Sequence, residues 1–564
     1  MNAWSFRTVT AAGFVSSLAL LAGLAACTGG SGDAPPAAFA DNLFSGLPTV
    51  CTRPASIPQG FDYPRSAEEI GRWVAARDEA RIRAHGWGLW AGLNMPSGGQ
   101  PVWRSWCTST QAFAAASAET PAAQPAAAPA PANANANANA AAPAARQIAV
   151  PFHRQRSLNA IRRSHGAAGS EDPIVFPNAP VYPVPQQVQN DYPQCYIPPQ
   201  NGQPAGLADG TIFESNGDIM IAGVIYNPPA YLATRGRRLF QGSTLDGMMR
   251  SPPTPPGQNA RMPAMPAGSI ALKPMMWPIA AEGYTALPVW DNPGSDNDSY
   301  AGFEIQSLWP RAVAVTQGPV PTGARADVTY LYNVKQSDGT TDLGPNTYRQ
   351  AEVFSLANFY AFRFPDLAAL DPCDRAILDA SAWWAYNRPF QAGDALAVVA
   401  MHIMTKEQPA WTFQSVWWHD RPNDGVYAAG RPDLRLARGP WRHYLMASTY
   451  GLSAVPGGNS YPVAFNPYIE LAADHPIRTN CMNCHHRAAW PRKPRNPHGS
   501  YEAPSPPGPD SLAMFDWTSP IFNGLLQTDA LWSIPDRAYE PSGGTPAASG
   551  GGGSEVGNGR PARR

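Results

Sequence analysis

The chain lacks an excess of charge of either sign. Its 41 Lys and Arg residues are balanced by 42 Asp and Glu residues, which leaves a formal net charge of −1 at pH 7. Proteins that bind nucleic acids gather basic residues into patches or stripes that meet the phosphate backbone. The balance of charge therefore predicts no nucleic-acid partner and no electrostatic attraction to an anionic membrane surface.

Long apolar runs are also missing after the N-terminus, where one short run extends from Ala11 to Leu24. A membrane-spanning helix needs roughly 18 apolar residues or more. Arg7 precedes this run, and Leu24-Ala25-Ala26-Cys27 resembles the lipobox of bacterial lipoproteins. We therefore predict that residues 1–26 are a lipoprotein signal peptide and that the mature chain begins at a lipidated Cys27.

Lipidation of Cys27 predicts an exported protein that is anchored to a membrane and faces the periplasm. Thr28 follows the cysteine, where Asp would favour the inner membrane. By the sorting rule of bacterial lipoproteins, this predicts the outer membrane rather than the inner one. The alternative is ordinary signal cleavage, which would leave a soluble periplasmic protein.

Cysteine is scarce, and none follows Cys484. A structural zinc site takes four ligands, usually Cys or His, but after Cys484 and the adjacent His485 and His486 the only further histidine is His498. A redox-active pair of cysteines typically lies in a thioredoxin-like βαβ frame. The pair in this chain, Cys481 and Cys484, is followed instead by Pro491, Pro494 and Pro497. Zinc binding and disulfide exchange are therefore both disfavoured.

The most informative motif present is Cys481-Met482-Asn483-Cys484-His485, the C-x-x-C-H signature of covalent haem attachment. The two thiols reach two vinyl groups on one edge of the porphyrin, and the imidazole of His485 binds the iron as proximal ligand. With 7 Cys and 10 His in 564 residues, a chance match is rare. The motif predicts one haem c, and export agrees with it because c-type haem is attached outside the cytoplasmic membrane.

Four cysteines remain outside the signal peptide and the haem motif: Cys51, Cys107, Cys195 and Cys373. An even number in an oxidising compartment is compatible with two disulfides, for which three connectivities exist. We prefer the pair Cys51–Cys107, because both residues fall in one N-terminal module that a disulfide would stabilise. Buried free thiols are the alternative.

Composition divides the chain into modules. Residues 113–146 are nearly all Ala, Pro, Asn and Gln and predict a disordered linker, and residues 538–564 form a Gly- and Ser-rich tail that we also predict to be disordered. A small, mainly helical module at 42–112 precedes the linker, and a large module at 147–537 lies between the linker and the tail. The predicted fold class is α+β: a beta-rich large module with a short C-terminal haem-bearing helix.

Local patterns predict several elements of these modules. Ser66-Ala67-Glu68-Glu69 has the form of a capping box and predicts a helix that extends to Gly86. The Trp-rich block at 85–92 is interpreted as a packing corner. Asp371-Pro372 predicts the start of a helix over 373–386.

A β-hairpin is predicted after this helix. Residues 394–404 are rich in Val, Ala and Ile, and residues 411–418 are rich in aromatic residues, with a connection at 406–409. In the first strand, Met401 and His402 must point to opposite faces of the sheet.

The sixth ligand of the iron is left open by the residues. Met514 is the only Met after the motif, but a Pro-rich stretch at 504–509 lies between them. Upstream, the predicted hairpin region from Asp394 to Asp420 offers Met401, His402, Met404 and His419 as further candidate distal ligands. His486 points away from the same iron and is interpreted as a solvated side chain.

These motifs together resemble a known family. Ala400-Met401-His402-Ile403, then Trp411-Thr412-Phe413, then the haem motif form a pattern similar to that of large bacterial secreted c-type cytochromes. The resemblance implies one c-type haem and makes His402 the first choice for a distal ligand or pocket residue, against the alternative of a packed strand histidine.

A weaker resemblance concerns the run from Ala267 to Lys273. It is similar to small beta-rich cytochromes that oxidise hydroxylamine or bind nitric oxide, in some of which a Lys is bonded to the haem. Because Lys273 precedes the haem motif by over two hundred residues, we interpret it as a surface or strand-end residue.

Two functions are compatible with these patterns. A six-coordinate iron predicts electron transfer, which we favour, with a redox partner that the sequence does not identify. An open distal position predicts a haem enzyme or gas-binding protein with peroxidase, oxygenase or nitrogen-oxide chemistry. In that case the pocket would be walled by Trp383, Trp384, Trp417 and Trp418.

Overall fold

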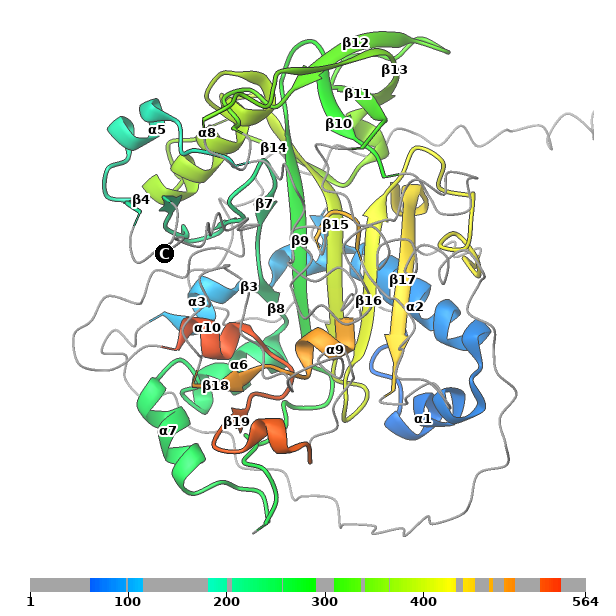
Figure 1. Cartoon of the computed structure of the whole chain (residues 1–564). Coiled ribbons are helices and arrows are strands. Elements are labelled where there is room, and N and C mark those ends of the chain that lie inside the picture. Colours follow the sequence, from blue (N-terminus) through cyan, green and yellow to red (C-terminus); the bar gives the residue numbers. More distant parts are fainter. Residues whose placement is uncertain are drawn as a thin grey trace, which may run out of the picture.

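The computed structural model describes the residues from 61 to 538 with gaps (Figure 1). The described ranges are 61–97, 100–114, 181–199, 205–255, 257–290, 309–335, 340–364, 366–432, 440–451, 466–469, 481–491 and 518–538. The predicted signal peptide, Cys27, Cys51 and Met514 lie outside them, as do nearly all of the predicted linker and tail. Among the described helices, none is both long and apolar enough to cross a membrane.

The largest sheet in the described residues has nine strands and is antiparallel. Its long strands are β9 (Ile270–Ile279), β15 (Ala395–Thr405), β16 (Thr412–Trp418) and β17 (Tyr444–Tyr450), in the spatial order β17-β16-β15-β9. Short strands complete it: β3 (Cys107–Thr108), β6 (Glu214–Ser215), β7 (Ile221–Ala222), β8 (Ile225–Tyr226) and β14 (Ala361–Arg363).

Strands β15 and β16 form the predicted hairpin, joined by residues 406–411. Every residue of β15 except His402 is buried, and all of β16 is buried. Helices and loops cover both faces, so the strands are near-continuous apolar runs rather than strict alternations. The hairpin was predictable because its pattern is local in the chain.

A second sheet lies beside one end of the first. It contains β10 (Thr285–Pro288), β11 (Ala312–Thr316), β12 (Arg325–Tyr330) and β13 (Asn346–Ser355). Helix α8 (Pro372–Tyr386) packs near it, and the Asp371 carboxylate accepts a hydrogen bond from the Cys373 N–H, which confirms the predicted N-cap. The mixture of helices with a large antiparallel sheet confirms the α+β class.

The predicted N-terminal helix is two helices, α1 (Ala67–Ala76) and α2 (Glu79–Leu93). Ser66 caps α1 as predicted, because its hydroxyl accepts a hydrogen bond from the Glu69 N–H. The predicted extension to Gly86 as one helix is wrong, since Arg77 adopts a left-handed conformation with φ 53° and Asp78 caps the next helix.

The described residues of the N-terminal module share a core with the rest of the chain. Strand β3 pairs with β8 in the large sheet, and the predicted packing corner buries Trp87 and Trp90 completely. Gly86 of α2 lies directly against Met446 of β17 and Gln414 of β16. In Figure 1, α2 runs behind this part of the sheet and α9 lies in front of it.

The remaining short elements surround the large sheet. The helices are α3 (Ser109–Phe113), α5 (Gln186–Asp191), α6 (Pro228–Gly236), α7 (Gly242–Arg250), α9 (Cys481–His485) and α10 (Ser533–Arg537). The two-stranded pairs are β1 (Pro96–Ser97) with β2 (Gln100–Pro101), β4 (Tyr196–Ile197) with β5 (Gly206–Leu207), and β18 (Ala489–Trp490) with β19 (Leu526–Gln527). Short 3-10 turns begin at residues 102, 356, 440 and 520.

A disulfide joins Cys195 to Cys373 at the start of α8. Cys107 is also disulfide-bonded, and Cys51, its expected partner, lies outside the described residues. The pair Cys195–Cys373 is the one that remains when Cys51 pairs with Cys107. Cys481 is buried.

Candidate haem site

Helix α9 presents the residues of the C-x-x-C-H motif. Cys481 and His485 are four residues apart and therefore lie on the same face of the helix, one turn apart. Cys484 lies within the same helix. Immediately afterwards, strand β18 pairs with β19, so that residues 518–538 lie against the end of α9. This pairing brings a segment far along the chain to the motif.

The orientation of the His485 imidazole is fixed by one hydrogen bond. Its Nδ1 lies 2.9 Å from the carbonyl oxygen of Ala530, which can only accept, so Nδ1 carries the proton. Burial lowers the pKa of His485 to about 3, against the opposing effect of the Ala530 carbonyl, and the nearby His402 adds to the lowering. The ring is therefore neutral at pH 7, and its Nε2 holds an unshared electron pair.

The carbonyl of Ala530 belongs to a strained turn. Asp529 and Ala530 have φ values of 50° and 67°, a left-handed conformation that residues other than glycine rarely adopt. The Asp529 carboxylate accepts hydrogen bonds from Lys406 Nζ at 2.6 Å and from the Met265 N–H at 2.7 Å. Lys406 lies in the connection between β15 and β16.

The face of the large sheet that meets α9 carries a polar row. Lys273, His402 and Ser415 lie directly across from one another on β9, β15 and β16, so their side chains share one face. Phe413 lies two residues before Ser415 on that face, and its ring centroid is 5.3 Å from that of His485. The structure thus brings His402 to the sheet face covered by the motif helix.

The methionine candidates of β15 divide between the two faces. Met404 lies two residues from His402 and shares its face, whereas Met401 lies directly across from Val416 and faces the side that α2 covers. Both side chains are buried. Of the distal candidates on this strand, His402 and Met404 are therefore the two on the α9 side.

Two neighbouring predictions are wrong. His486 is buried rather than solvated, and its Nε2–H donates to the Ala410 carbonyl at 2.9 Å, while burial lowers the pKa of the ring to about 4. Lys273 is the fourth residue of β9 rather than a strand-end residue, and it is half-buried. Its charge acts on His485.

The four tryptophans that were predicted to wall one pocket belong to separate packing clusters. Trp417 packs on Tyr427, with ring centroids 5.0 Å apart, on the α9 side of the sheet. Trp418 faces the other side and stacks on Phe359 at 4.2 Å. Trp383 and its neighbour Trp384 lie on α8, where Trp384 packs against Tyr182. They do not form one wall.

A separate cavity of about 370 Å³ lies beside α1 and α2, with Trp73, His85 and Arg65 among its lining residues. The His85 Nδ1 is 2.7 Å from the Tyr450 hydroxyl, and its Nε2 is 3.3 Å from the Glu407 carboxylate. Both ring nitrogens therefore face protein groups instead of the cavity. This polar cluster ties α2 to the sheet.

Sequence reasoning missed Lys406, Asp529 and Ala530. Asp529 and Ala530 follow the motif by more than forty residues, and no local pattern links them to it. Lys406 did carry a signal, because it is a charged residue at the end of a strongly apolar strand and must find a partner if buried.

No group of three or more His, Cys, Asp or Glu residues in the described ranges is arranged to hold a bare metal ion. Comparison of the chain with protein-family models, with curated proteins and with solved structures gave no match. The function of the chain is therefore inferred from the motif and from the geometry around it.

Proposed function

We propose that this chain is an exported mono-haem c-type cytochrome that acts in electron transfer. Haem c would be bound through Cys481 and Cys484 on helix α9, with His485 as the proximal iron ligand. The single observation that carries the proposal is the hydrogen bond from His485 Nδ1 to the Ala530 carbonyl. Iron-binding histidines usually make such a bond with the nitrogen that does not bind the metal.

The donor set fits a haem iron in three respects. The protonated Nδ1 leaves Nε2 as the nitrogen able to bind iron. The low pKa keeps His485 neutral, so that no proton competes for Nε2 near pH 7. Cys481 lies on the same face of the helix as His485, one turn away. When bound, the haem would supply a one-electron couple between ferric and ferrous iron.

His402 is the proposed distal ligand. It lies on the face of the sheet that α9 covers, and its proximity lowers the pKa of His485. Two imidazoles would give a six-coordinate iron, which favours electron transfer over reaction at the metal. Met404 on the same face is the next candidate on this strand.

The proposal includes export and anchoring through a lipidated Cys27, on the periplasmic side of the outer membrane. The disulfide between Cys195 and Cys373 supports it, because stable disulfides belong to oxidising compartments. The redox partner would meet the protein there.

The first test is covalent attachment. We expect the denatured wild-type protein to stain for haem, and the variant Cys481→Ala with Cys484→Ala to lose the stain. Staining that persists in this variant would overturn the proposal.

The second test concerns coordination, read from optical spectra of the ferric and the dithionite-reduced protein with and without carbon monoxide. We expect a low-spin spectrum that carbon monoxide does not alter in the wild type, and a high-spin ferric spectrum in His402→Ala. Met401→Ala is the matched control, because it shortens the adjacent side chain on the opposite face. A wild-type spectrum that shifts with carbon monoxide would replace electron transfer with an open, ligand-binding iron site.

A further inference from the structure

The ion pair between Lys406 and Asp529 is almost completely removed from solvent. Lys406 Nζ lies 2.6 Å from Asp529 Oδ1, and the side chains are 5% and 6% exposed. Nζ also donates to the Pro409 carbonyl at 2.7 Å and lies 5.1 Å from the centre of the Trp411 ring. Burial of two charges is unfavourable in itself, so such a pair is poorly explained by stability alone.

The pair holds a short segment in an unfavourable conformation. Both oxygens of the Asp529 carboxylate are used: Oδ1 binds Lys406, and Oδ2 accepts the Met265 N–H. The same residue and Ala530 have left-handed backbones. Such strain persists where the surroundings fix it, and it often marks a functional position.

The strained turn determines where the Ala530 carbonyl points. Its oxygen lies 2.9 Å from His485 Nδ1, so a relaxed backbone at 529–530 would turn this oxygen away from the ring. Lys406 comes from the hairpin whose first strand carries His402. One buried pair thus connects the hairpin to the partner of the proposed iron ligand.

We propose that Lys406 and Asp529 are positioning residues that aim the Ala530 carbonyl at His485 and thereby lower the reduction potential of the haem. The inference rests on the proposed function. A strong hydrogen bond from Nδ1 to a carbonyl raises the basicity of the ring and so favours ferric iron. Loss of this bond raises the potential.

The variant Lys406→Met separates positioning from simple electrostatics. Removal of a positive charge near the iron favours the ferric state and by itself lowers the potential. Loss of the hydrogen bond between His485 and the Ala530 carbonyl raises the potential instead. We expect the midpoint potential of full-length, haem-loaded Lys406→Met to rise relative to wild type, and a fall or no change would overturn the inference.

A milder variant covers the case in which Lys406→Met does not fold. Lys406→Gln is neutral but keeps a donor for Asp529. If Lys406 has a positioning role, the midpoint potential of Lys406→Gln should rise by less than that of Lys406→Met. If only the charge matters, the potential of Lys406→Gln should fall. The charge-neutral double variant Lys406→Met with Asp529→Asn should also raise the potential, and an unchanged value there would contradict positioning.

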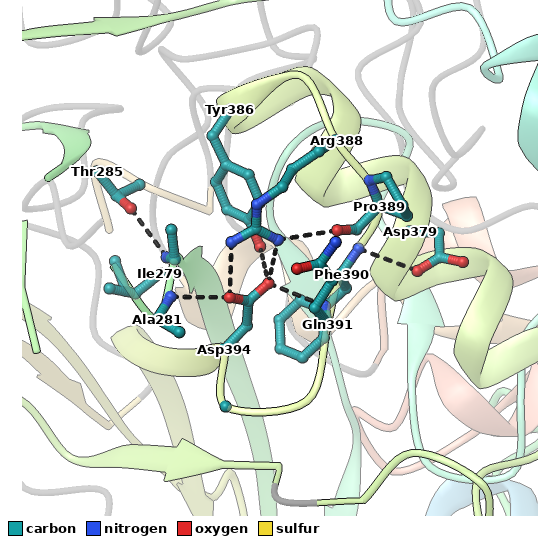
Figure 2. A network of polar contacts seen from close by, with 12 residues as sticks. Ile279, Ala281, Thr285, Asp379, Tyr386, Arg388, Pro389, Phe390, Gln391 and Asp394 are labelled. Carbon is teal, nitrogen blue, oxygen red and sulfur yellow. Dashed lines mark hydrogen bonds and ion pairs between the residues drawn. The ribbon is translucent and has the colours of Figure 1, made fainter. Parts of the chain in front are cut away.

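Arg388→Met is the matched control, because it breaks another ion pair with a buried carboxylate, Asp394, at the opposite end of β15 (Figure 2). It should leave the potential unchanged. Haem staining separates the two proposals: a wild-type protein without covalent haem refutes the proposed function. A stained wild-type protein whose Lys406 variants do not raise the potential refutes only the positioning role.

Discussion

Strand β15 has an ion pair with a buried carboxylate at each end, and the two pairs differ in what they connect. Before the strand, Arg388 donates to Asp394 through two nitrogens, at 2.6 and 2.8 Å, and the partners are six residues apart (Figure 2). After the strand, Lys406 donates to Asp529, 123 residues away. The first pair closes a local turn, whereas the second joins two distant segments beside α9.

The number of donors around each carboxylate differs as well. Figure 2 shows Arg388 and Tyr386 pointing toward Asp394, which also accepts from the backbone N–H groups of Ala281 and Gln391. Asp529 accepts from Lys406 and from one backbone N–H. A carboxylate with many donors serves the fold, because any one donor is partly replaceable. The comparison teaches that burial of an ion pair alone does not identify a functional position; the segment that it orients does.

The largest expected effect on stability comes from breaking either pair on its cationic side. Removal of the cation leaves an uncompensated buried carboxylate, so Lys406→Met should lower the free energy of unfolding by about 3 kcal/mol. Arg388→Met should lower it by less, because Tyr386 and two backbone N–H groups still donate to Asp394. Urea unfolding measures this. Arg72→Met breaks the exposed pair with Glu68 and should change the free energy by less than about 0.5 kcal/mol. If Arg388→Met also changed the free energy of unfolding by less than about 0.5 kcal/mol, its pair with Asp394 would behave like an exposed pair and could not be compared with the pair of Lys406 and Asp529.

A third buried carboxyl sharpens the comparison through pH. Burial raises the pKa of Asp218 to about 7, against hydrogen bonds from Asn216 and the Met220 N–H that oppose the rise. Between about pH 4 and 7 the folded state keeps a proton that the unfolded chain has lost. The free energy of unfolding should therefore fall as pH rises through this window, by up to about 1.4 kcal/mol per pH unit for this group.

The variant Asp218→Asn should remove that part of the pH dependence, measured by urea unfolding at a series of pH values. Asp191→Asn, at an exposed position, is the control. Parallel curves for wild type and Asp218→Asn would show that Asp218 does not hold the extra proton.

The smallest expected effect concerns the strain beside the second pair. Ala530→Gly removes a side chain from a residue with φ 67°. Relief of about 1 kcal/mol of left-handed strain is partly offset by the extra freedom of glycine in the unfolded chain, so the free energy of unfolding should rise by about 0.5 kcal/mol. A fall of more than about 1 kcal/mol in thermal or urea unfolding would mean that the turn is not strained.

The parts of the fold that could be predicted are those encoded by neighbouring residues. Ser66 and Asp371 cap helices through hydrogen bonds to residues two or three positions away. The two strands of the β15–β16 hairpin follow each other directly in the sequence. Lys273 illustrates the limit. Its position across from His402 depends on the register of two strands over a hundred residues apart, which no local pattern specifies.

The candidate site divides in the same way. The motif itself names Cys481, Cys484 and His485, because its spacing follows from the chemistry of the porphyrin. The carbonyl that orients His485 comes from Ala530, a residue whose side chain plays no part and which therefore leaves no trace in composition. Backbone groups of this kind become visible only when the chain path is known.

The shared core has a consequence for the order in which the protein is synthesised. Residues 61–114 leave the ribosome first among the described segments, yet Arg83 donates to the carbonyl of Met446, 363 residues later. Trp87 and Trp90 on the same helix are completely buried in the finished protein. Until β17 and the residues just before it have been made, Tyr444 and Trp441, which pack on Trp90 and Trp87, are missing from the surface that covers them. The burial of this helix can therefore be completed only after the last third of the chain has been synthesised. A chain that ends early would expose the tryptophan-rich helix to chaperones and proteases.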